Sequence, residues 1–233
     1  MSLRFGCFVT GTDTGVGKTL VSAALVHKLA TAGLRAVGMK PLAAGAALRE
    51  GQLWNEDVAM LSAQSSVSLP VDLICPLMFR DAAAPHIAAT LEDRTIDIAT
   101  VMSAYRQLSA QVDALVVEGV GGFRVPLSDD LDTADLAAEM QLGVILVVGL
   151  RLGCLNHALL TADAIASRGL TLSGWVANQI DPAMPHQAAN LEALSRRLPA
   201  PLLGVVRWMP VASASEAAAG IDASRLPGWP ASR

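Results

Sequence analysis

Apolar runs of strand length recur along the chain and are separated by segments of helix length. The runs are apolar throughout instead of alternating with polar residues, which is typical of strands whose sheet is covered on both faces. They predict strands at 4–10, 35–39, 114–118, 143–149, 173–178 and 202–206. The segments between them predict helices at 18–32, 96–111, 133–141, 157–168 and 185–198. In the second of these helices, apolar residues return at helical spacing and form one face: Ile98, Val101, Met102, Tyr105 and Val112.

The alternation of strands with helices indicates the fold class. Parallel strands joined by right-handed helical crossovers form an α/β, doubly wound, mainly parallel sheet with helices on both faces. Neither an internal repeat nor a Pro/Ser/Gly linker divides the chain, so we expect one domain over residues 1–233. Residues 42–95 have the least regular pattern. Residues 211–233 are rich in Ala and Ser and then in Pro, and we expect them to form a peripheral tail.

Composition argues against two broad classes of protein. Hydrophobic residues make up 52% of the 233 residues and charged residues 16%, which is not the composition of a disordered chain. The longest apolar run, 142–150, ends at Arg151 and is far shorter than the roughly 20 residues of a membrane-spanning helix. Arg4 is followed by a strand pattern and not by a signal-peptide layout. We therefore expect a soluble, cytoplasmic protein without a membrane partner.

Charge, cysteines and histidines exclude further kinds of site. Seventeen basic against 21 acidic residues give a net charge of −4, and no basic stripe is present, so we expect no nucleic-acid partner. Cys7, Cys75 and Cys154 are too few and too scattered for a disulfide framework or a zinc site, and free thiols fit a reducing compartment. The four histidines lack the partners of a nucleophilic triad or a metal cluster, and His86 alone is kept as a candidate ligand contact.

A glycine-rich turn, GTDTGVGKT, spans residues 11–19 between the first predicted strand and the first predicted helix. This context is typical of a phosphate-binding loop, although the first glycine lies one residue earlier than in the usual pattern. Glycines let backbone N–H groups converge on phosphate oxygens, and the helix start adds unpaired N–H groups. The turn predicts a nucleoside triphosphate site, with a turn that binds no ligand as the alternative. Its predicted contacts are Thr12, Asp13, Gly15, Val16, Gly17, Lys18 and Thr19.

Three further residues are candidates beside this loop. Glu118 ends an apolar strand and precedes the glycine-rich residues 119–122, so it would ligate Mg²⁺ or else only cap the strand. Asp57 is a second candidate carboxylate, with a helix N-cap role as its alternative. Lys40 ends the second predicted strand before Pro41, which predicts that it points into the crevice above the sheet. A surface lysine is the alternative for Lys40.

Together these residues resemble the dethiobiotin synthetase family over most of the chain, to about Met209. The phosphate loop alone is shared by a large superfamily, whereas LGCLNH at 152–157 and GWVAN at 174–178 are far more specific. The resemblance also rests on the segments 11–19, 40–41, 55–57, 85–86, 117–119, 121–122 and 199–204.

The resemblance implies a reaction and the roles of individual residues. The family joins CO₂ to 7,8-diaminononanoate as a carbamate, phosphorylates the carbamate with ATP and closes the cyclic urea of dethiobiotin. By resemblance, Lys18 and Lys40 hold the phosphates and Thr14 faces the diamine or carbamate. Asn178 then contacts the adenine. The implied ligands of Mg²⁺ are Thr19, Asp57 and Glu118.

The resemblance also implies a homodimer with the active site at its interface. One subunit would contact the diamine through Thr14, Lys40 and Gly121. The substrate carboxylate would be received at a helix start of the partner subunit, by Leu152, Gly153 and Asn156.

Three positions depart from the family pattern, and two other functions remain open. Gly15 stands where some members have a glutamate, Ala44 replaces a common serine or threonine, and Arg207 replaces a common proline near the nucleobase. One alternative is another ATP-dependent ligase of the superfamily, but its cobyrinate-amidating members carry a glutaminase domain for which 233 residues leave no room. The other is a partitioning or septum-positioning switch ATPase, which would have an extra lysine at the position of Asp13.

Overall fold

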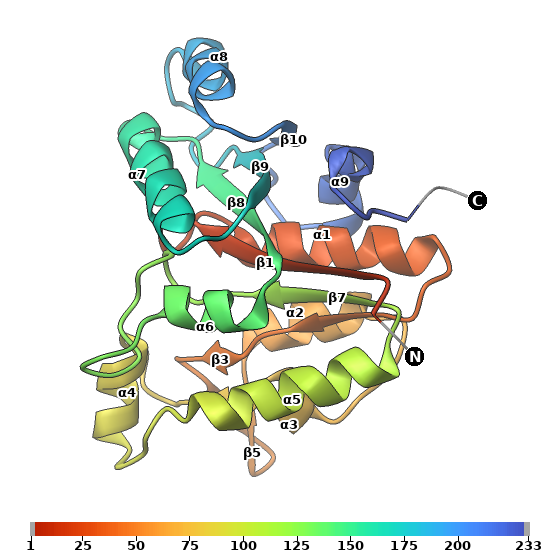
Figure 1. Cartoon of the computed structure of the whole chain (residues 1–233), viewed down its shortest axis with the longest axis vertical. Coiled ribbons are helices and arrows are strands. Elements are labelled where there is room, and N and C mark those ends of the chain that lie inside the picture. The colour runs from red at the N-terminus through yellow and green to blue at the C-terminus, as the bar shows by residue number, and fades with distance from the viewer. Residues whose placement is uncertain (1–2, 231–233) are drawn as a thin grey trace.

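Six parallel strands form the central sheet of the computed structural model, which describes residues 3–230 (Figure 1). Their order across the sheet is β10-β9-β8-β1-β7-β2. Each predicted strand is present, and its bounds differ from the prediction by at most one residue. The bounds are β1 Phe5–Gly11, β2 Ala36–Met39, β7 Ala114–Glu118, β8 Gly143–Gly149, β9 Leu172–Asn178 and β10 Leu202–Val206.

Successive residues of a strand pack on opposite faces of the sheet. In β7, Ala114 and Val116 pack in the core that contains α1 (Lys18–Thr31) and α9 (Ala214–Ala219). Leu115 packs on the opposite face. The helices on that second face are α5 Ile98–Gln111, α6 Thr133–Met140, α7 Cys154–Ser167 and α8 Gln187–Arg197. Because both faces are covered, the strands show no polar alternation, and the predicted doubly wound α/β sheet is confirmed (Figure 1).

The irregular segment 42–95 folds into short elements. Helix α2 begins after Asn55, whose side-chain oxygen accepts hydrogen bonds from the backbone N–H groups of Asp57 and Val58. Asn55 is therefore the N-cap, and the alternative of an N-cap role for Asp57 is wrong. The elements are β3 Leu42–Ala43, β4 Ala47–Arg49, β5 Gln52–Trp54, α2 Glu56–Gln64, α3 Val71–Ile74, β6 Leu77–Met78 and α4 Pro85–Leu91.

Helix α7 begins at Cys154, three residues before the predicted start at 157. Gly153 has a φ of 95°, which is left-handed backbone that glycine adopts without strain, and it turns the chain directly into the helix. The other predicted helices differ from the structure by at most two residues at either end. None of the helices within residues 3–230 combines the length and the hydropathy that crossing a membrane requires.

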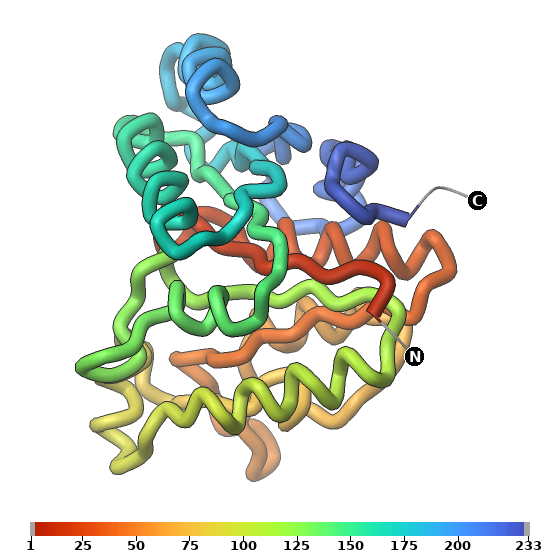
Figure 2. The backbone as a smooth tube through the Cα atoms, in the orientation of Figure 1, coloured from red at the N-terminus to blue at the C-terminus, as the bar shows by residue number. Residues whose placement is uncertain are grey.

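Residues 211–230 of the expected peripheral tail pack on the core, contrary to our expectation. They form α9 and the short helix η1 (Ala223–Arg225), and α9 lies beside α1 (Figure 2). Lys28 of α1 donates a hydrogen bond to the carbonyl oxygen of Ala218. The apolar side chains of this segment are few and mostly small, but they fill the core over α1: Ala217, Ala218, Ile221, Ala223 and Leu226. Residues 231–233 lie outside the described part of the chain.

Candidate active site

The glycine-rich turn connects β1 to α1, and its residue Asp13 contacts the side chain of Lys18. Gly15 and Gly17 have φ values of 73° and 89°, in the left-handed region that favours glycine. A Cβ atom on Gly17 would lie 2.0 Å from Nδ2 of Asn178, so a side chain has no room there. Lys18 is the first residue of α1, and its Nζ donates a hydrogen bond to the carbonyl oxygen of Asp13 at 3.0 Å. The loop and the N-terminus of α1 therefore present backbone N–H groups and an ammonium group together.

Lys18 is a buried cation. It is 7% exposed, and burial together with the nearby charge of Lys40 lowers the pKa of Lys18 to about 8. An anion bound at the loop would stabilise the charged form of this lysine. The electrostatics of the loop thus favour a phosphate group.

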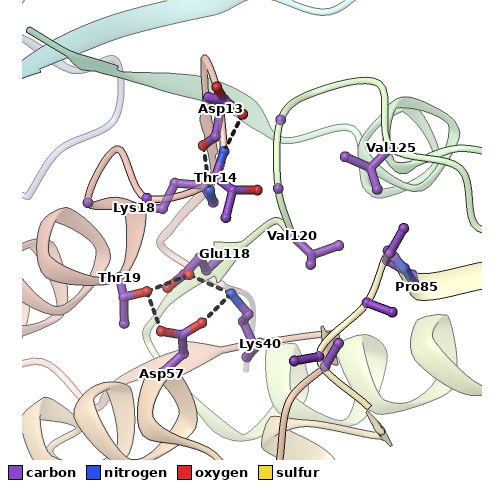
Figure 3. A pocket seen from close by; sticks show the side chains of 18 of the residues that line it. Asp13, Thr14, Lys18, Thr19, Lys40, Asp57, Pro85, Glu118, Val120 and Val125 are labelled. Carbon is purple, nitrogen blue, oxygen red and sulfur yellow. Dashed lines mark hydrogen bonds and ion pairs between the residues drawn. The ribbon is translucent and has the colours of Figure 1, made fainter. Parts of the chain in front are cut away.

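Four side chains form a cluster beside the loop (Figure 3). They are Thr19 of α1, Asp57 of α2, Glu118 at the end of β7 and Lys40, which directly follows β2. Nζ of Lys40 lies 2.6 Å from Oε1 of Glu118 and 2.9 Å from Oδ2 of Asp57. Oγ1 of Thr19 lies 2.8 Å from Oδ1 of Asp57 and 2.9 Å from Oε1 of Glu118. Lys40 is 3% exposed, so the alternative of a surface lysine is wrong.

The charges of the cluster stabilise one another. Burial alone would lower the pKa of Lys40, but the carboxylates of Glu118 and Asp57 raise it above its ordinary value. Burial would raise the pKa of Asp57, but the ammonium group of Lys40 holds it below its usual range. Lys40 and Asp57 are therefore both charged at neutral pH.

The oxygen atoms of the cluster fit a magnesium ion. The Thr19 hydroxyl and the carboxylates of Asp57 and Glu118 are the hard oxygen ligands that Mg²⁺ prefers. Oε2 of Glu118 is buried without a hydrogen-bond partner, which is costly unless a cation or a donor satisfies it. Over residues 3–230, no three His, Cys, Asp or Glu side chains are arranged to hold a metal by themselves. Further ligands would therefore come from phosphate oxygens and water.

The loop and the cluster open into a cavity of about 950 Å³ (Figure 3). The predicted site residues that line it are Asp13, Thr14, Gly15, Gly17, Lys18, Thr19, Lys40, Asp57, Glu118 and Gly121. The remaining wall residues, apart from Arg124, are small or apolar: Ala44, Ala82, Ala83, Ala84, Pro85, Val120, Gly122 and Val125. Sequence reasoning did not single out Ala82–Ala84, Arg124 or Val125, because alanine and valine have no chemical signature. Arg124 stands two residues after the glycine run, and that position was the one signal available.

A smaller pocket of about 260 Å³ adjoins the same loop, and Gly15 lines both. Nδ2 of Asn178 donates a hydrogen bond to the carbonyl oxygen of Val16 at 2.9 Å. This contact holds the end of β9 against the phosphate loop. The pocket is lined by Gly15, Leu20, Asn178, Gln179, Ile180, Arg207, Trp208, Met209 and Ala212.

The chain is similar to known proteins along nearly its whole length. A family model described as an AAA domain matches residues 6–216. An ATP-dependent dethiobiotin synthetase BioD from Janthinobacterium sp. (strain Marseille) is 53% identical over 234 residues, which cover 99% of each chain. A protein of the same name from Aromatoleum aromaticum (strain DSM 19018 / LMG 30748 / EbN1) is 55% identical, over 95% of this chain and 97% of its own. The chain belongs to the dethiobiotin synthetase family.

A solved structure supports the fold of this dethiobiotin synthetase family member. The septum site-determining protein MinD complexed with Mg-ADP from Pyrococcus horikoshii OT3 is 18% identical, with a TM-score of 0.53 over 97% of this chain and 89% of that one. Likeness at this identity shows the fold alone, and it confirms the P-loop NTPase-like architecture. The much higher identity to the synthetases disfavours the septum-positioning alternative.

Some of the predicted site residues lie outside the main cavity. The backbone N–H of Thr12 donates to Val147 in the sheet, and the side chain of Val16 packs in the core. Asn178 lines the smaller pocket instead. His86 does not line the cavity, and its Nδ1 lies 3.2 Å from the carbonyl oxygen of Pro126. The residues at the start of α7 are exposed: Leu152, Gly153 and Asn156.

One contact ties the start of α7 to the phosphate loop, and sequence reasoning missed it. Arg151, which precedes this helix start, forms an ion pair with Asp13 across a separation of 138 positions. The backbone N–H of Thr14 and the Arg151 guanidinium both hold the pKa of the Asp13 carboxyl below its ordinary value. The glycine-rich loop and the exposed helix start are thus in direct contact.

Proposed function

We propose that this chain catalyses the ATP-dependent carboxylation and ring closure of 7,8-diaminononanoate to dethiobiotin, with release of ADP and phosphate. The observation that carries the proposal is the cavity that joins the phosphate loop to the cluster of Lys40, Asp57, Glu118 and Thr19. The two relatives above, which are named as ATP-dependent dethiobiotin synthetases, support it.

The walls of the cavity suit this substrate. One end carries the ammonium groups of Lys18 and Lys40, and the wall beyond it is built from small apolar side chains such as Ala83 and Val125. Diaminononanoate has a polar diamine at one end of an aliphatic chain. An aliphatic chain gains by leaving water for such a wall, while the diamine end lies at the charged cluster.

The reaction needs electrostatic stabilisation more than a general base. An amine of the substrate and CO₂ form a carbamate with loss of a proton, and the carbamate oxygen is already an anion. It attacks the γ-phosphorus of ATP, and the bond to ADP breaks. The second amine then attacks the carbamate carbon, phosphate leaves and a proton is lost as the ring closes. This sequence agrees with the absence of a histidine among the residues that line the described cavity.

Lys18 and Lys40 oppose the repulsion between the carbamate and the triphosphate. Both ammonium groups are buried in the cavity wall, where a fixed charge acts more strongly than in water. Lys18 would bind the β- and γ-phosphates, and Lys40 would stabilise charge on the transferring phosphoryl group. Thr14 and Gly121, which line the same cavity, would contact the carbamate or diamine.

Thr19, Asp57 and Glu118 are the proposed holders of Mg²⁺. When bound, the ion neutralises charge on the phosphates during transfer. The ammonium group of Lys40 contacts both carboxylates and so holds Asp57 and Glu118 near each other. The nucleobase would lie in the smaller pocket beside Asn178.

We also propose that the enzyme works as a homodimer in the cytoplasm. Leu152 is 96% exposed although it is apolar, and Asn156 is exposed beside it, so both are open to contact by a second subunit. In that arrangement the start of α7 would bind the substrate carboxylate of the other subunit through its unpaired N–H groups. The three cysteines are free, which suits a reducing compartment.

Phosphate release from ATP tests the proposal directly. We expect release only when diaminononanoate and bicarbonate are both present, together with formation of a cyclic urea detectable by mass spectrometry. A switch ATPase would hydrolyse ATP without the diamine. Phosphate release that ignores the diamine would therefore refute the proposed reaction while leaving the nucleotide site intact.

A further inference from the structure

Arg207 lies beside the residue that anchors the smaller pocket. In the sheet, Val206 at the end of β10 pairs with Asn178 at the end of β9, and Arg207 is the next residue. Arg207 and Asn178 line the same pocket. Because parallel strands end at one edge of the sheet, the two residues lie near each other at that edge.

The neutral amides of the pocket spend part of their hydrogen-bonding capacity on contacts within the protein. Nδ2 of Asn178 uses one of its two N–H donors on the carbonyl oxygen of Val16, which leaves one N–H and the acceptor Oδ1 for a base. Nε2 of Gln179 contacts Oε1 of Gln187 at 2.7 Å, and Oε1 of Gln179 accepts the backbone N–H of Trp208. An amide that offers Oδ1 and one N–H matches the amino group and N7 of adenine, and its Oδ1 opposes the keto oxygen of guanine.

Arg207 adds charged donors to those of the amides. It is the one charged residue among those that line the smaller pocket. Its side chain has no hydrogen bond or ion pair to another residue within 3–230, and it is exposed. A guanidinium group matches two adjacent acceptors, and guanine presents such a pair in N7 and O6. Adenine has N7 but carries an amino donor in place of O6.

We propose that Arg207 is a specificity-determining residue that lets this site use GTP as well as ATP. The inference rests on the proposed function for the reaction, and on the smaller pocket for the place of the base. Asn178 favours the amino purine and Arg207 favours the keto purine, so neither nucleotide is excluded. Arg207→Ala leaves the acceptor of Asn178 alone in the pocket and restores a preference for ATP.

Binding of ADP and GDP to the purified protein tests this without any diamine, by isothermal titration calorimetry. We expect the wild type to bind GDP within about tenfold of ADP, and Arg207→Ala to lose about tenfold in GDP affinity with less than about twofold change for ADP. Arg207→Lys keeps the charge but lacks the planar fork, so it should lose GDP affinity as well. Arg196→Ala, which removes an exposed arginine on α8, is the matched control and should change neither affinity.

The outcomes separate the two proposals. Equal losses of GDP and ADP in Arg207→Ala would show base-independent stacking and would overturn the inference, as would a wild type that does not bind GDP. In the full reaction, the ratio of kcat/KM for GTP to that for ATP should fall about tenfold in the same variant. A protein with the expected GDP and ADP affinities but no diamine-dependent phosphate release would refute the proposed reaction and leave the role of Arg207 standing.

Discussion

Nζ of Lys40 lies 2.6 Å from Oε1 of Glu118, and the register of two neighbouring strands produces this contact. Met39 of β2 pairs with Val117 of β7, so the next residue of each strand, Lys40 and Glu118, meet at the same edge of the sheet. The lysine neutralises a carboxylate that would otherwise be buried alone. The pair is therefore a consequence of the register of the sheet itself.

Glu118→Gln should weaken the response to magnesium. The substitution keeps the shape of the side chain but removes the charge that attracts the cation, while Asp57 and Thr19 remain. We expect the Mg²⁺ concentration for half-maximal phosphate release to rise at least about tenfold, as is usual when a metal ligand or its support is lost. A magnesium titration of diamine-dependent phosphate release measures this.

Glu92→Gln is the control for the magnesium titration. Glu92 follows α4 and accepts a hydrogen bond from the backbone of Arg80, outside the cavity. The magnesium requirement of Glu92→Gln should equal that of the wild type. An unchanged requirement in Glu118→Gln as well would exclude Glu118 as a ligand.

Lys18→Ala should remove most of the turnover. Its ammonium group is expected to act on charge that develops in the transferring phosphoryl group, and losing one such donor costs about 3–4 kcal/mol, or about 10²–10³-fold in kcat. Steady-state phosphate release measures the loss. Lys28→Ala is the matched control in the same helix, because Lys28 contacts Ala218 and lies far from the cavity lining. Near-normal turnover in Lys18→Ala would remove this lysine from the mechanism.

Nucleotide affinity should fall as the pH rises above about 8. The lowered pKa of Lys18, about 8, means that this lysine loses its proton there in the free protein, and a neutral amine no longer attracts phosphate. We expect the Kd for ADP to increase by up to about tenfold per pH unit between pH 8 and 10. Lys18→Arg stays charged over this range, so its Kd should stay flat. A similar slope in both proteins would assign the pH dependence to another group.

The same pKa has a consequence for folding stability, with a defined sign. An unfolded lysine titrates near pH 10.4, so between about pH 8 and 10 the unfolded chain binds more protons at Lys18 than the folded protein does. Lys18 therefore makes the free energy of unfolding rise with pH in this window. Lys40 does not add to this effect there, because its raised pKa keeps it protonated in the folded state. Lys18→Met should remove this contribution, which urea unfolding at several pH values would measure.

The sequence predicts the chemistry of the site better than its walls. Glu118 and Lys40 could be placed because each ends an apolar strand, and strand ends of a parallel sheet share one edge. Ala82–Ala84 could not, because alanine looks the same in a wall, a core or a loop. The contact of Arg151 with Asp13 depends on tertiary structure across 138 positions, which no local pattern records.

The fold was also predictable in one part, the strands of the sheet, and not in another, the C-terminal segment. The strands were predictable because burial on both faces leaves a continuous apolar run. The error at 211–233 arose because Ala and Ser dominate the segment, and their small side chains give a weak periodic signal. Packing against α1 buries Ala217 and Ala218 even so, because small residues let two helices approach closely.

Mixed dimers test whether the active site is shared between subunits. If Asn156 at the start of α7 serves the other subunit's cavity, Asn156→Ala and Lys18→Ala disable different halves of each site. A mixture of the two inactive variants, dissociated in mild denaturant and reassociated, should then recover up to about a quarter of the wild-type activity, since half of the dimers are hybrids with one intact site. Native mass spectrometry would confirm that hybrid dimers form. If their activity stays at the level of the separate variants, Asn156 does not complete the other subunit's site. The structure favours recovery, because Asn156 is exposed and does not line the cavity that Lys18 enters.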